Sequence, residues 1–336
     1  MSDAVLSPDE IAALRMSVRA SIERCGDAAQ VVDDVGALDL LDDALPVLAV
    51  FFEEFGRHNL VNALTDAVVG HALGLEDTAV TYGLPKSGRA DPPAATADGA
   101  GLYVDAVLRA PAALPSRAVL PLDGGAVVVP LSELHLSPAT GFDRDGAWQH
   151  VAGHVKQETQ TIVTTADWAR AVAVTRLCLG SEILGAAAQV NAVAVKHVTE
   201  RRQFGKSLGS FQTVRHRLAE AYVAIQAAQT ILDLAWTTVA APTTSAEDTV
   251  HYGIAAKAMA GRAFESASRT ANQVCGGMGL TLEHPLPALV RRGSALNVLL
   301  GDPTDLTASL GRDLCDAVAL PIPDPLVPDG EHVGAH

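Results

Sequence analysis

The sequence stretch ERRQFGKSLGSFQTVRHRLAE, residues 200–220, separates two long helical patterns. Apolar spacing predicts one helix from Thr165 to about Val198, and a second that begins at an N-cap, Ser210. The second helix carries an apolar face of Phe211, Val214, Leu218, Tyr222 and Ile225. The arginines between them have two interpretations. In the first, they form an anion site, because guanidinium groups pair with phosphate oxygens. In the second, they form a solvated basic helix end, which the helix dipole favours. From the residues alone, the second is commoner.

A second stretch, QVCGGMGLTLEHPLPALVRRG at residues 273–293, follows another helical pattern. That helix opens with Ser245 and Asp248 as a capping box and ends at Gly276 and Gly277. Paired glycines let a ligand approach the backbone closely, and their N–H groups can face an anion. The alternative is an ordinary glycine C-cap, which is the commoner role of such a pair.

The remaining pattern divides the chain into three parts and a tail. Residues 1–75 are predicted to be helical. The first helix begins at a capping box of Ser7 and Glu10, with Pro8 at the first helical position, and a second helix covers Leu45–Arg57 and is stopped by Gly56. Residues 76–160 contain short strand-like runs between Pro and Gly punctuation, such as Gly101–Leu108 and Ala126–Val129. Residues 161–320 are predicted to form an antiparallel helical bundle, with further helices over Pro285–Leu299 and Thr304–Ala319, and residues 321–336 a mobile tail.

The composition excludes several classes of protein. Of the 336 residues, 49% are hydrophobic, and 24 basic residues against 39 acidic ones give a net charge of −15. A general nucleic-acid binder is therefore not expected, because it needs a basic face. Leu177–Val195 is the most apolar stretch, but it carries Glu182, Gln189 and Asn191, which favours a buried core helix over a membrane span. The N-terminus lacks the pattern of a signal peptide, so a cytoplasmic location is expected.

No metal site is predicted from the cysteines and histidines. The four cysteines are far apart and form no CxxC pair, which is typical of reduced cytoplasmic thiols. His150 and His154 are four residues apart, but no third ligand follows at a sensible spacing, so exposed polar histidines are the better interpretation. Glu182 is either a carboxylate with a tuned pKa or, more often in such a setting, a paired one.

Together, the two stretches resemble signatures of the acyl-CoA dehydrogenase family. Residues 200–220 match its R-x-x-F-G…F-Q…L-A pattern, and residues 273–293 match its Q-x-x-G-G-x-G…E-x-P…R-R/D pattern, in the same order and at a similar separation. Thr175 and Arg176 fall where the family has an x-R pair in the preceding helix. The likeness is specific from about residue 165 to 300, whereas LSPDEIAALRMSVRASIE and FFEEFGR fit the N-terminal helical domain more loosely.

The resemblance implies a mainly α fold with a small β domain: an N-terminal helical domain, a shortened central β domain and a C-terminal four-helix bundle. It also implies FAD and the oxidation of an acyl-CoA to the α,β-enoyl-CoA, in which a carboxylate removes the α-proton and the flavin accepts a hydride. In the family, the adenine end of FAD reaches the C-terminal domain of a neighbouring subunit. The residues that match these contacts, with Arg201 on the pyrophosphate, are Arg201, Phe204, Gln212, Gln273, Gly276 and Gly277.

The sequence departs from the family at the base. The usual catalytic glutamate falls, by a count without gaps, on Leu300, and the alternative position before the helix arginine is Thr175. Neither side chain removes a proton at neutral pH, so no catalytic residue is predicted. The E-P-x-A-G-S-D-like and G-x-K-x-x-I-T-like motifs of the β domain are missing, and the family's T-S-E/Q is here Asp302-Pro303-Thr304.

These losses predict a required but non-catalytic subunit. The chain is similar to the short, truncated subunits of α2β2 acyl-CoA dehydrogenases from sterol-degrading bacteria, which act on steroid side-chain CoA thioesters. The resemblance implies FAD shared with a full-length acyl-CoA dehydrogenase partner, an acyl-CoA substrate and an electron acceptor, without nucleic acid or membrane. Two alternatives stay open: a homomeric dehydrogenase whose base is Glu182 or Glu200, and a structural or regulatory pseudoenzyme.

Overall fold

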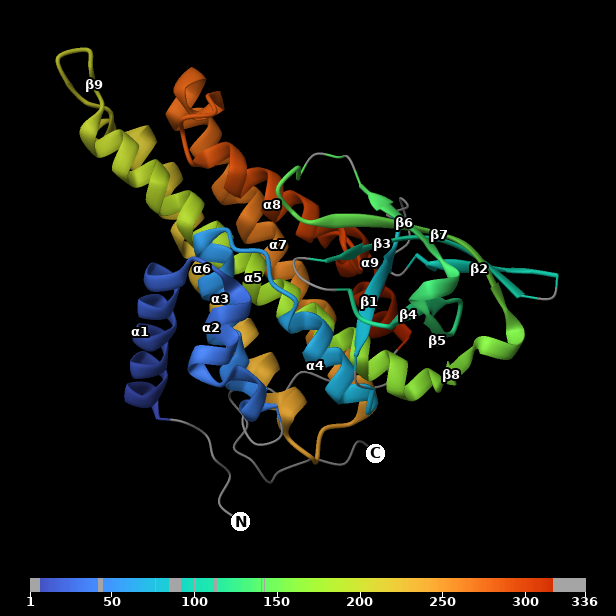
Figure 1. Ribbon diagram of the computed structural model, residues 1–336. Coiled ribbons are helices and arrows are strands. Elements are labelled where there is room, and N and C mark those ends of the chain that lie inside the picture. Colours follow the sequence, from blue (N-terminus) through green and yellow to red (C-terminus); the bar gives the residue numbers. More distant parts are fainter. Residues whose placement is uncertain are drawn as a thin grey trace, which may run out of the picture.

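The computed structural model describes residues 7–41, 45–75, 77–84, 92–99, 101–110, 114–139, 141 and 143–316. Helices from both ends of the chain pack together, and a sheet lies to one side of them (Figure 1). The mainly α fold with a small β domain is therefore confirmed. The predicted tail, residues 321–336, lies outside the described residues.

The N-terminal part is helical, as predicted. Its helices are α1 (Pro8–Cys25), α2 (Ala28–Val35), α3 (Leu48–His58) and α4 (Leu64–Leu73), with 3-10 turns at Ala37–Leu40 and Leu45–Val47. The capping box of Ser7 and Glu10 is present, with Pro8 in the first turn. The prediction that Gly56 stops its helix is wrong, because α3 continues to His58 and ends at Asn59 in the left-handed conformation. Gly56 instead lies where α3 touches the backbone of a later helix.

Strands form the central part of the chain. They are β1 (Thr78–Gly83), β2 (Ala95–Asp98), β3 (Gly101–Arg109), β4 (Arg117–Leu122), β5 (Gly125–Pro130), β6 (His135–Pro138), β7 (Trp148–Lys156) and β8 (Thr161–Val163). The sheet order is β6-β7-β3-β1-β4-β5-β8, with β2 paired to β3. Strands β1 and β4 are parallel, and the other described pairs are antiparallel. Strand β8 extends the sheet to Val163, three residues beyond the predicted boundary at 160.

Long helices form the C-terminal part. They are α5 (Thr165–Glu200), α6 (Gln212–Ala240), α7 (Ala246–Cys275), α8 (Leu286–Val298) and α9 (Pro303–Asp316); the hairpin β9 (Arg202–Gln203) and β10 (Lys206–Ser207) joins α5 to α6. Ser245 caps α7 as predicted. Ser210 does not cap α6; its hydroxyl donates to the carbonyl of Ser207, and Phe211 is the N-cap residue.

Helix α5 is the centre of the main core. It is long and apolar enough to cross a membrane, but 94% of its most apolar window is buried inside the protein. The predicted core helix is thus confirmed. One apolar cluster joins α5 to the N-terminal helices and the bundle, and a second fills the sheet around Val104, Leu120 and Val151. Helix α5 therefore connects the sheet to both groups of helices.

Candidate functional site

The loop after α8 is fixed by two buried cations. Arg176 Nε on α5 donates to the carbonyl oxygen of Leu300 at 3.1 Å, and Lys257 Nζ on α7 donates to the carbonyls of Asn297 at 2.9 Å and Gly301 at 2.6 Å. Leu300 is only 6% exposed and has a φ of 51°. This left-handed conformation is costly for a leucine and persists because the surroundings hold it.

The other expected base position lies in the same region. Thr175, next to Arg176, is 1% exposed, and its hydroxyl donates to the carbonyl of Ala171 at 2.7 Å. The hydroxyl donates within its own helix, and a neutral threonine hydroxyl is far too weak a base to remove a proton from a ligand. Leu300, whose carbonyl Arg176 binds, and Thr175, which precedes Arg176 in the chain, are thus both neutral side chains.

Glu182 is a paired carboxylate. The guanidinium of Arg109, at the end of β3, donates to its two oxygens at 2.9 and 3.0 Å, and Asn62 Nδ2 donates to Oε2 at 3.1 Å. Glu182 is fully buried, and the charge and hydrogen bonds of Glu182 raise the pKa of Arg109 against the effect of burial. This bidentate pair joins the sheet to α5, and it does not present a free base. Glu200 lies exposed at the C-terminal end of α5.

His150 and His154 lie on a strand. His154 is an exposed residue of β7 and His150 a half-buried one. The ring of His150 lies 2.8 Å from Asp105 on β3, and that of His154 lies 3.0 Å from Asp98 on β2. The prediction of exposed polar histidines holds for His154, whereas His150 is half-buried beside Asp105.

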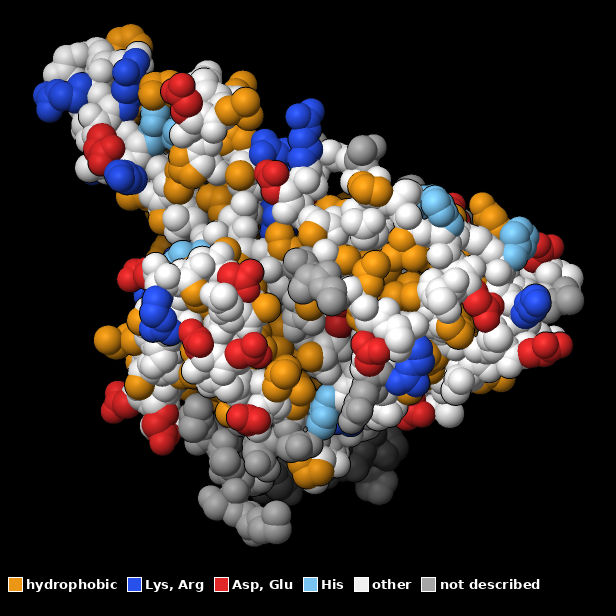
Figure 2. Space-filling view, viewed as in Figure 1, with side chains coloured by type: hydrophobic (Ala, Val, Ile, Leu, Met, Phe, Trp, Pro, Cys, Tyr) orange, Lys and Arg blue, Asp and Glu red, His pale blue; other side chains and the backbone are white. Residues whose placement is uncertain are grey.

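A cavity of about 610 Å³ lies at the end of the bundle, between the end of α5, the start of α6 and the end of α7. It brings together four of the six predicted cofactor residues, namely Arg201, Gln273, Gly276 and Gly277. Figure 2 shows several Lys and Arg side chains at this end of the molecule, where β9 is labelled in Figure 1. The lining itself contains Arg201 and Arg217 and no acidic residue, so the cavity is basic.

Two predicted residues do not line this cavity. Phe204 is 84% exposed at the turn of the β9–β10 hairpin, with a φ of 53°, and its ring makes an edge contact with Phe211. Gln212 is exposed, and its amide lies 3.5 Å from a ring nitrogen of His216. Both residues are next in sequence to residues that line the cavity, but their own side chains are not part of the lining.

Three lining residues with ionisable side chains were not predicted from the sequence. Arg217 donates a hydrogen bond to the amide oxygen of Gln273, and His197 and Cys275 line the cavity beside Arg201. Arg217 follows Thr213 by four residues, so helical spacing alone could have placed both on one face. His197 and Cys275 are 78 positions apart and gave no local signal.

The cavity fits the diphosphate end of a nucleotide cofactor. A Cβ added at Gly276 or Gly277 would meet nothing within 4 Å, so the backbone there is open to a ligand. Gly276 has a φ of 55°, which favours glycine at the end of α7. Arg201 and Arg217 provide guanidinium groups at the same cavity. This arrangement can bind a multiply charged anion such as a diphosphate.

Part of this chain is similar to known proteins. Residues 167–303 match the family model of the acyl-CoA dehydrogenase C-terminal domain. Two curated relatives named acyl-CoA dehydrogenase IpdE2 match it: the Mycolicibacterium smegmatis protein is 29% identical over 38% of this chain and 39% of its own length, and the Mycobacterium tuberculosis protein is 30% identical over 42% of each chain. The match thus spans about two fifths of these relatives.

Solved structures match nearly the whole chain. One, described as the Tcur3481-Tcur3483 steroid ACAD, has a TM-score of 0.71 at 20% identity and covers 91% of this chain and 98% of its own. Another, the ChsE4-ChsE5 complex from Mycobacterium tuberculosis, has a TM-score of 0.71 at 17% identity and covers 95% and 100%. Residues 167–303 thus match the model of the acyl-CoA dehydrogenase C-terminal domain, and the chain has the fold of the acyl-CoA dehydrogenases.

Proposed function

We propose that this chain is a required, non-catalytic subunit of a heteromeric, FAD-dependent acyl-CoA dehydrogenase. It binds the adenine and pyrophosphate end of an FAD whose ring lies in a full-length partner subunit. The observation that carries the proposal is the combination of an open basic cavity at Arg201, Gln273 and Gly276 with neutral residues, Leu300 and Thr175, at both positions of the base.

The role of the cavity residues follows from their chemistry. Arg201 pairs with the pyrophosphate, because a guanidinium donates two parallel hydrogen bonds to phosphate oxygens. The open backbone at Gly276 and Gly277 lets the cofactor approach closely, and the bond from Arg217 orients the amide of Gln273. The flavin, when bound, supplies the hydride-accepting chemistry of the complex. This chain contributes binding and orientation at the other end of the cofactor.

The interface between the sheet and α5 supports the non-catalytic part. The buried pair of Arg109 and Glu182 fills this interface, with Asn62 beside it. Arg109 also lies 5.8 Å from the centre of the Trp148 ring, so the charged pair is enclosed on the sheet side. A ligand that enters between Arg109 and Glu182 must open a buried ion pair, and opening one is strongly destabilising.

The partners and substrate follow from the relatives. Two of the structural neighbours are described by pairs of names, and one of these as a steroid ACAD. On this basis the partner is a full-length acyl-CoA dehydrogenase subunit in an α2β2 assembly, and the substrate class is steroid side-chain CoA thioesters. The assembly passes electrons to a separate acceptor, and a cytoplasmic location fits its thiols.

The test is the flavin content of the chain alone and with a full-length acyl-CoA dehydrogenase encoded beside it. We expect no flavin alone and half a flavin per chain in the complex. Arg201→Ala removes a charged hydrogen bond to phosphate, which costs about 1.5–3 kcal/mol, so the affinity of the complex for FAD falls roughly ten- to a hundredfold. Arg202→Ala is the matched control, because this neighbouring arginine is exposed on β9 and does not line the cavity.

Each alternative predicts a different result. A homomer that binds flavin and oxidises acyl-CoA by itself would establish the autonomous enzyme, and Glu200→Gln would then test the remaining exposed candidate for its base. A complex whose activity survives removal of this chain would establish a structural or regulatory pseudoenzyme. Equal flavin content in the Arg201→Ala and Arg202→Ala complexes would contradict the proposed role of the cavity.

A further inference from the structure

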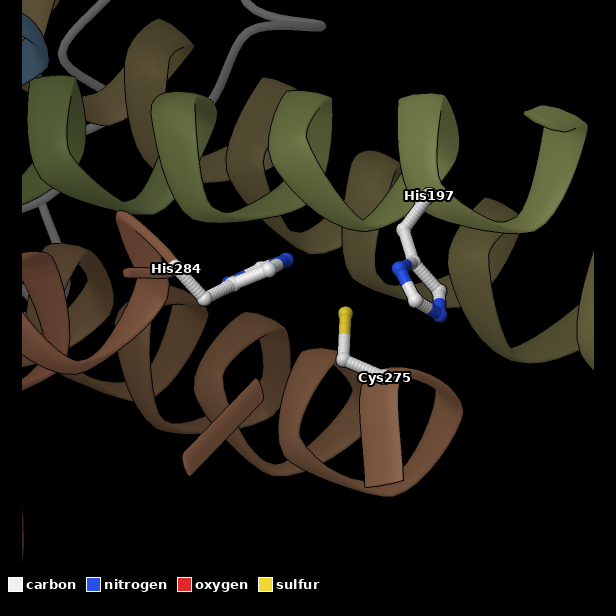
Figure 3. Close-up of side chains that lie close together, drawn as sticks. All are labelled: His197, Cys275 and His284. Atoms are coloured by element: carbon white, nitrogen blue, oxygen red, sulfur yellow. The ribbon is translucent and has the colours of Figure 1, made fainter. Parts of the chain in front are cut away.

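Three metal-ligating side chains meet at the wall of the cavity. His197 comes from α5, Cys275 from the last turn of α7 and His284 from the turn before α8. One ligand atom of each lies within 4.8 Å of those of the other two. Figure 3 shows the thiol pointing into the space between the two rings, with the tip of the His284 ring directed toward His197. The rings stand edge to face, with centroids 5.8 Å apart.

The surroundings of this cluster suit neutral ligands. Burial, together with the charges of His284 and Arg201, lowers the pKa of His197, so that its imidazole is neutral near pH 7 with a lone pair available. Cys275 is 5% exposed, and burial raises the pKa of its thiol. The thiol therefore stays protonated until a cation at the cluster favours the thiolate.

We propose that His197, Cys275 and His284 form a binding site for a zinc-class divalent ion, with a fourth position open to the cavity. One sulfur and two imidazole nitrogens suit the tetrahedral preference and intermediate softness of Zn²⁺. Because His197 and Cys275 also line the cavity, the fourth position faces solvent or an anion bound there. This site goes beyond the proposed FAD function and does not depend on it.

Binding requires a small closure and a defined proton balance. Zinc bonds of about 2.0–2.3 Å place tetrahedral ligand atoms about 3.5 Å apart, so the three side chains must move together by about 1 Å. Cys275 releases its thiol proton to solvent. The Leu286 N–H donates to His284 Nδ1 at 3.3 Å, so binding at Nε2 moves the ring proton to Nδ1 and gives up this long hydrogen bond.

Cobalt is the probe for this site, because tetrahedral cobalt–thiolate sites are coloured. The full-length chain is titrated with Co²⁺ under reducing conditions, and Zn²⁺ then displaces the cobalt. We expect one equivalent to bind, with a thiolate-to-cobalt charge-transfer band and visible ligand-field bands. Cys275→Ser abolishes the charge-transfer band. His197→Ala and His284→Ala weaken binding at least as much as the roughly 10–100-fold loss that follows removal of an outer-shell partner.

Matched controls separate this site from adventitious binding. Cys315→Ser removes an exposed thiol and His154→Ala an exposed imidazole, both outside the cluster, and neither changes the spectrum or the affinity. Absence of the charge-transfer band from the wild type, or its persistence in Cys275→Ser, would overturn the proposal. X-ray absorption of the zinc-loaded wild type gives an answer even if a variant misfolds: one sulfur neighbour supports the site, and an all-oxygen shell refutes it. Flavin content is measured separately, so the two proposals can fail independently.

Discussion

Arg176 on α5 holds Leu300 by its backbone, through a hydrogen bond of 3.1 Å from Nε to the leucine carbonyl. The bond fixes the loop that follows α8, in which Leu300 has a left-handed φ of 51° and Gly301 a φ of 102°. Because this bond goes to the backbone carbonyl, it does not require a particular side chain at position 300. The loop is thus preserved without the acidic group that the resemblance places on it.

Restoring an acid at this position is predicted not to restore catalysis. Leu300→Glu buries a carboxylate at a site that is 6% exposed, and an uncompensated buried charge costs about 3–5 kcal/mol. We expect a lower free energy of unfolding, measured by urea titration. Turnover and flavin content of the complex stay unchanged, because the pair of Arg109 and Glu182 still fills the interface beside α5.

Leu300→Met is the control for this experiment, because a swap of similar volume between apolar residues costs less than about 1.5 kcal/mol. A rise in turnover of the Leu300→Glu complex, or a flavin content of one per chain, would show that this chain does bind a flavin ring. The non-catalytic part of the proposed function would then be wrong.

Local sequence signals predicted most of the helices and much of the cavity. The helix caps at Ser7, Ser245 and Gly276 bond to backbone groups only a few residues away, so the local sequence was enough to predict each of them correctly. Arg201 and Gln273 were placed by motifs. The pair of Arg109 and Glu182 spans 73 positions, and only the folded chain brings a sheet residue to the middle of α5.

The wrong predictions share one physical cause. Gly56 was interpreted as a helix stop, and Ser210 as a cap, because these are the commonest local roles of glycine and serine. Tertiary packing decided otherwise in the first case, since α3 needs a residue without a side chain where it meets α5. Phe204 is a different case: the left-handed turn of its hairpin leaves it exposed, and its contact with the cofactor stays a prediction.

Stability is predicted to fall as the pH rises through neutrality, because of Asp66. This carboxylate lies in the wall of a cavity of about 620 Å³ between α4 and the sheet and accepts a hydrogen bond from the Val80 N–H at 2.9 Å. Burial raises the pKa of Asp66 to about 7. Between about pH 4 and pH 7 the folded state therefore holds a proton that the unfolded state has released. Since the folded state binds more protons in this window, the free energy of unfolding decreases as the pH rises.

Asp66→Asn tests this dependence. The amide stays neutral and can still accept the Val80 hydrogen bond, so the variant escapes a penalty of at most roughly 4 kcal/mol at pH 8. We expect the variant to be more stable than the wild type at pH 8, with a flatter profile between pH 5 and 8 in urea titrations. Asp233→Asn, at an exposed position on α6, serves as the control. Parallel profiles for Asp66→Asn and the wild type would contradict the assignment.

The crossing of α3 and α5 depends on two glycines that face each other's helix. A Cβ at Gly56 would lie 1.9 Å from the carbonyl oxygen of Glu182, and one at Gly185 would lie 1.9 Å from that of Glu53. Such overlaps force the two backbones apart, and overpacking of this kind typically costs about 1–3 kcal/mol. Gly56→Ala and Gly185→Ala are therefore predicted to lower the free energy of unfolding, although alanine is the better helix former.

Gly311→Ala on α9 separates packing from helix propensity. A Cβ there meets nothing within 4 Å, so this substitution gains up to about 1 kcal/mol from propensity alone. Opposite signs for Gly311→Ala and the two crossing variants, measured by thermal and urea unfolding, are the expected result. If Gly56→Ala stabilises the chain as Gly311→Ala does, then α3 does not approach α5 this closely. The hydrogen bond of 3.1 Å from Asn62, which follows α3, to Glu182 on α5 would then be in doubt as well, because it depends on the close approach of the two helices.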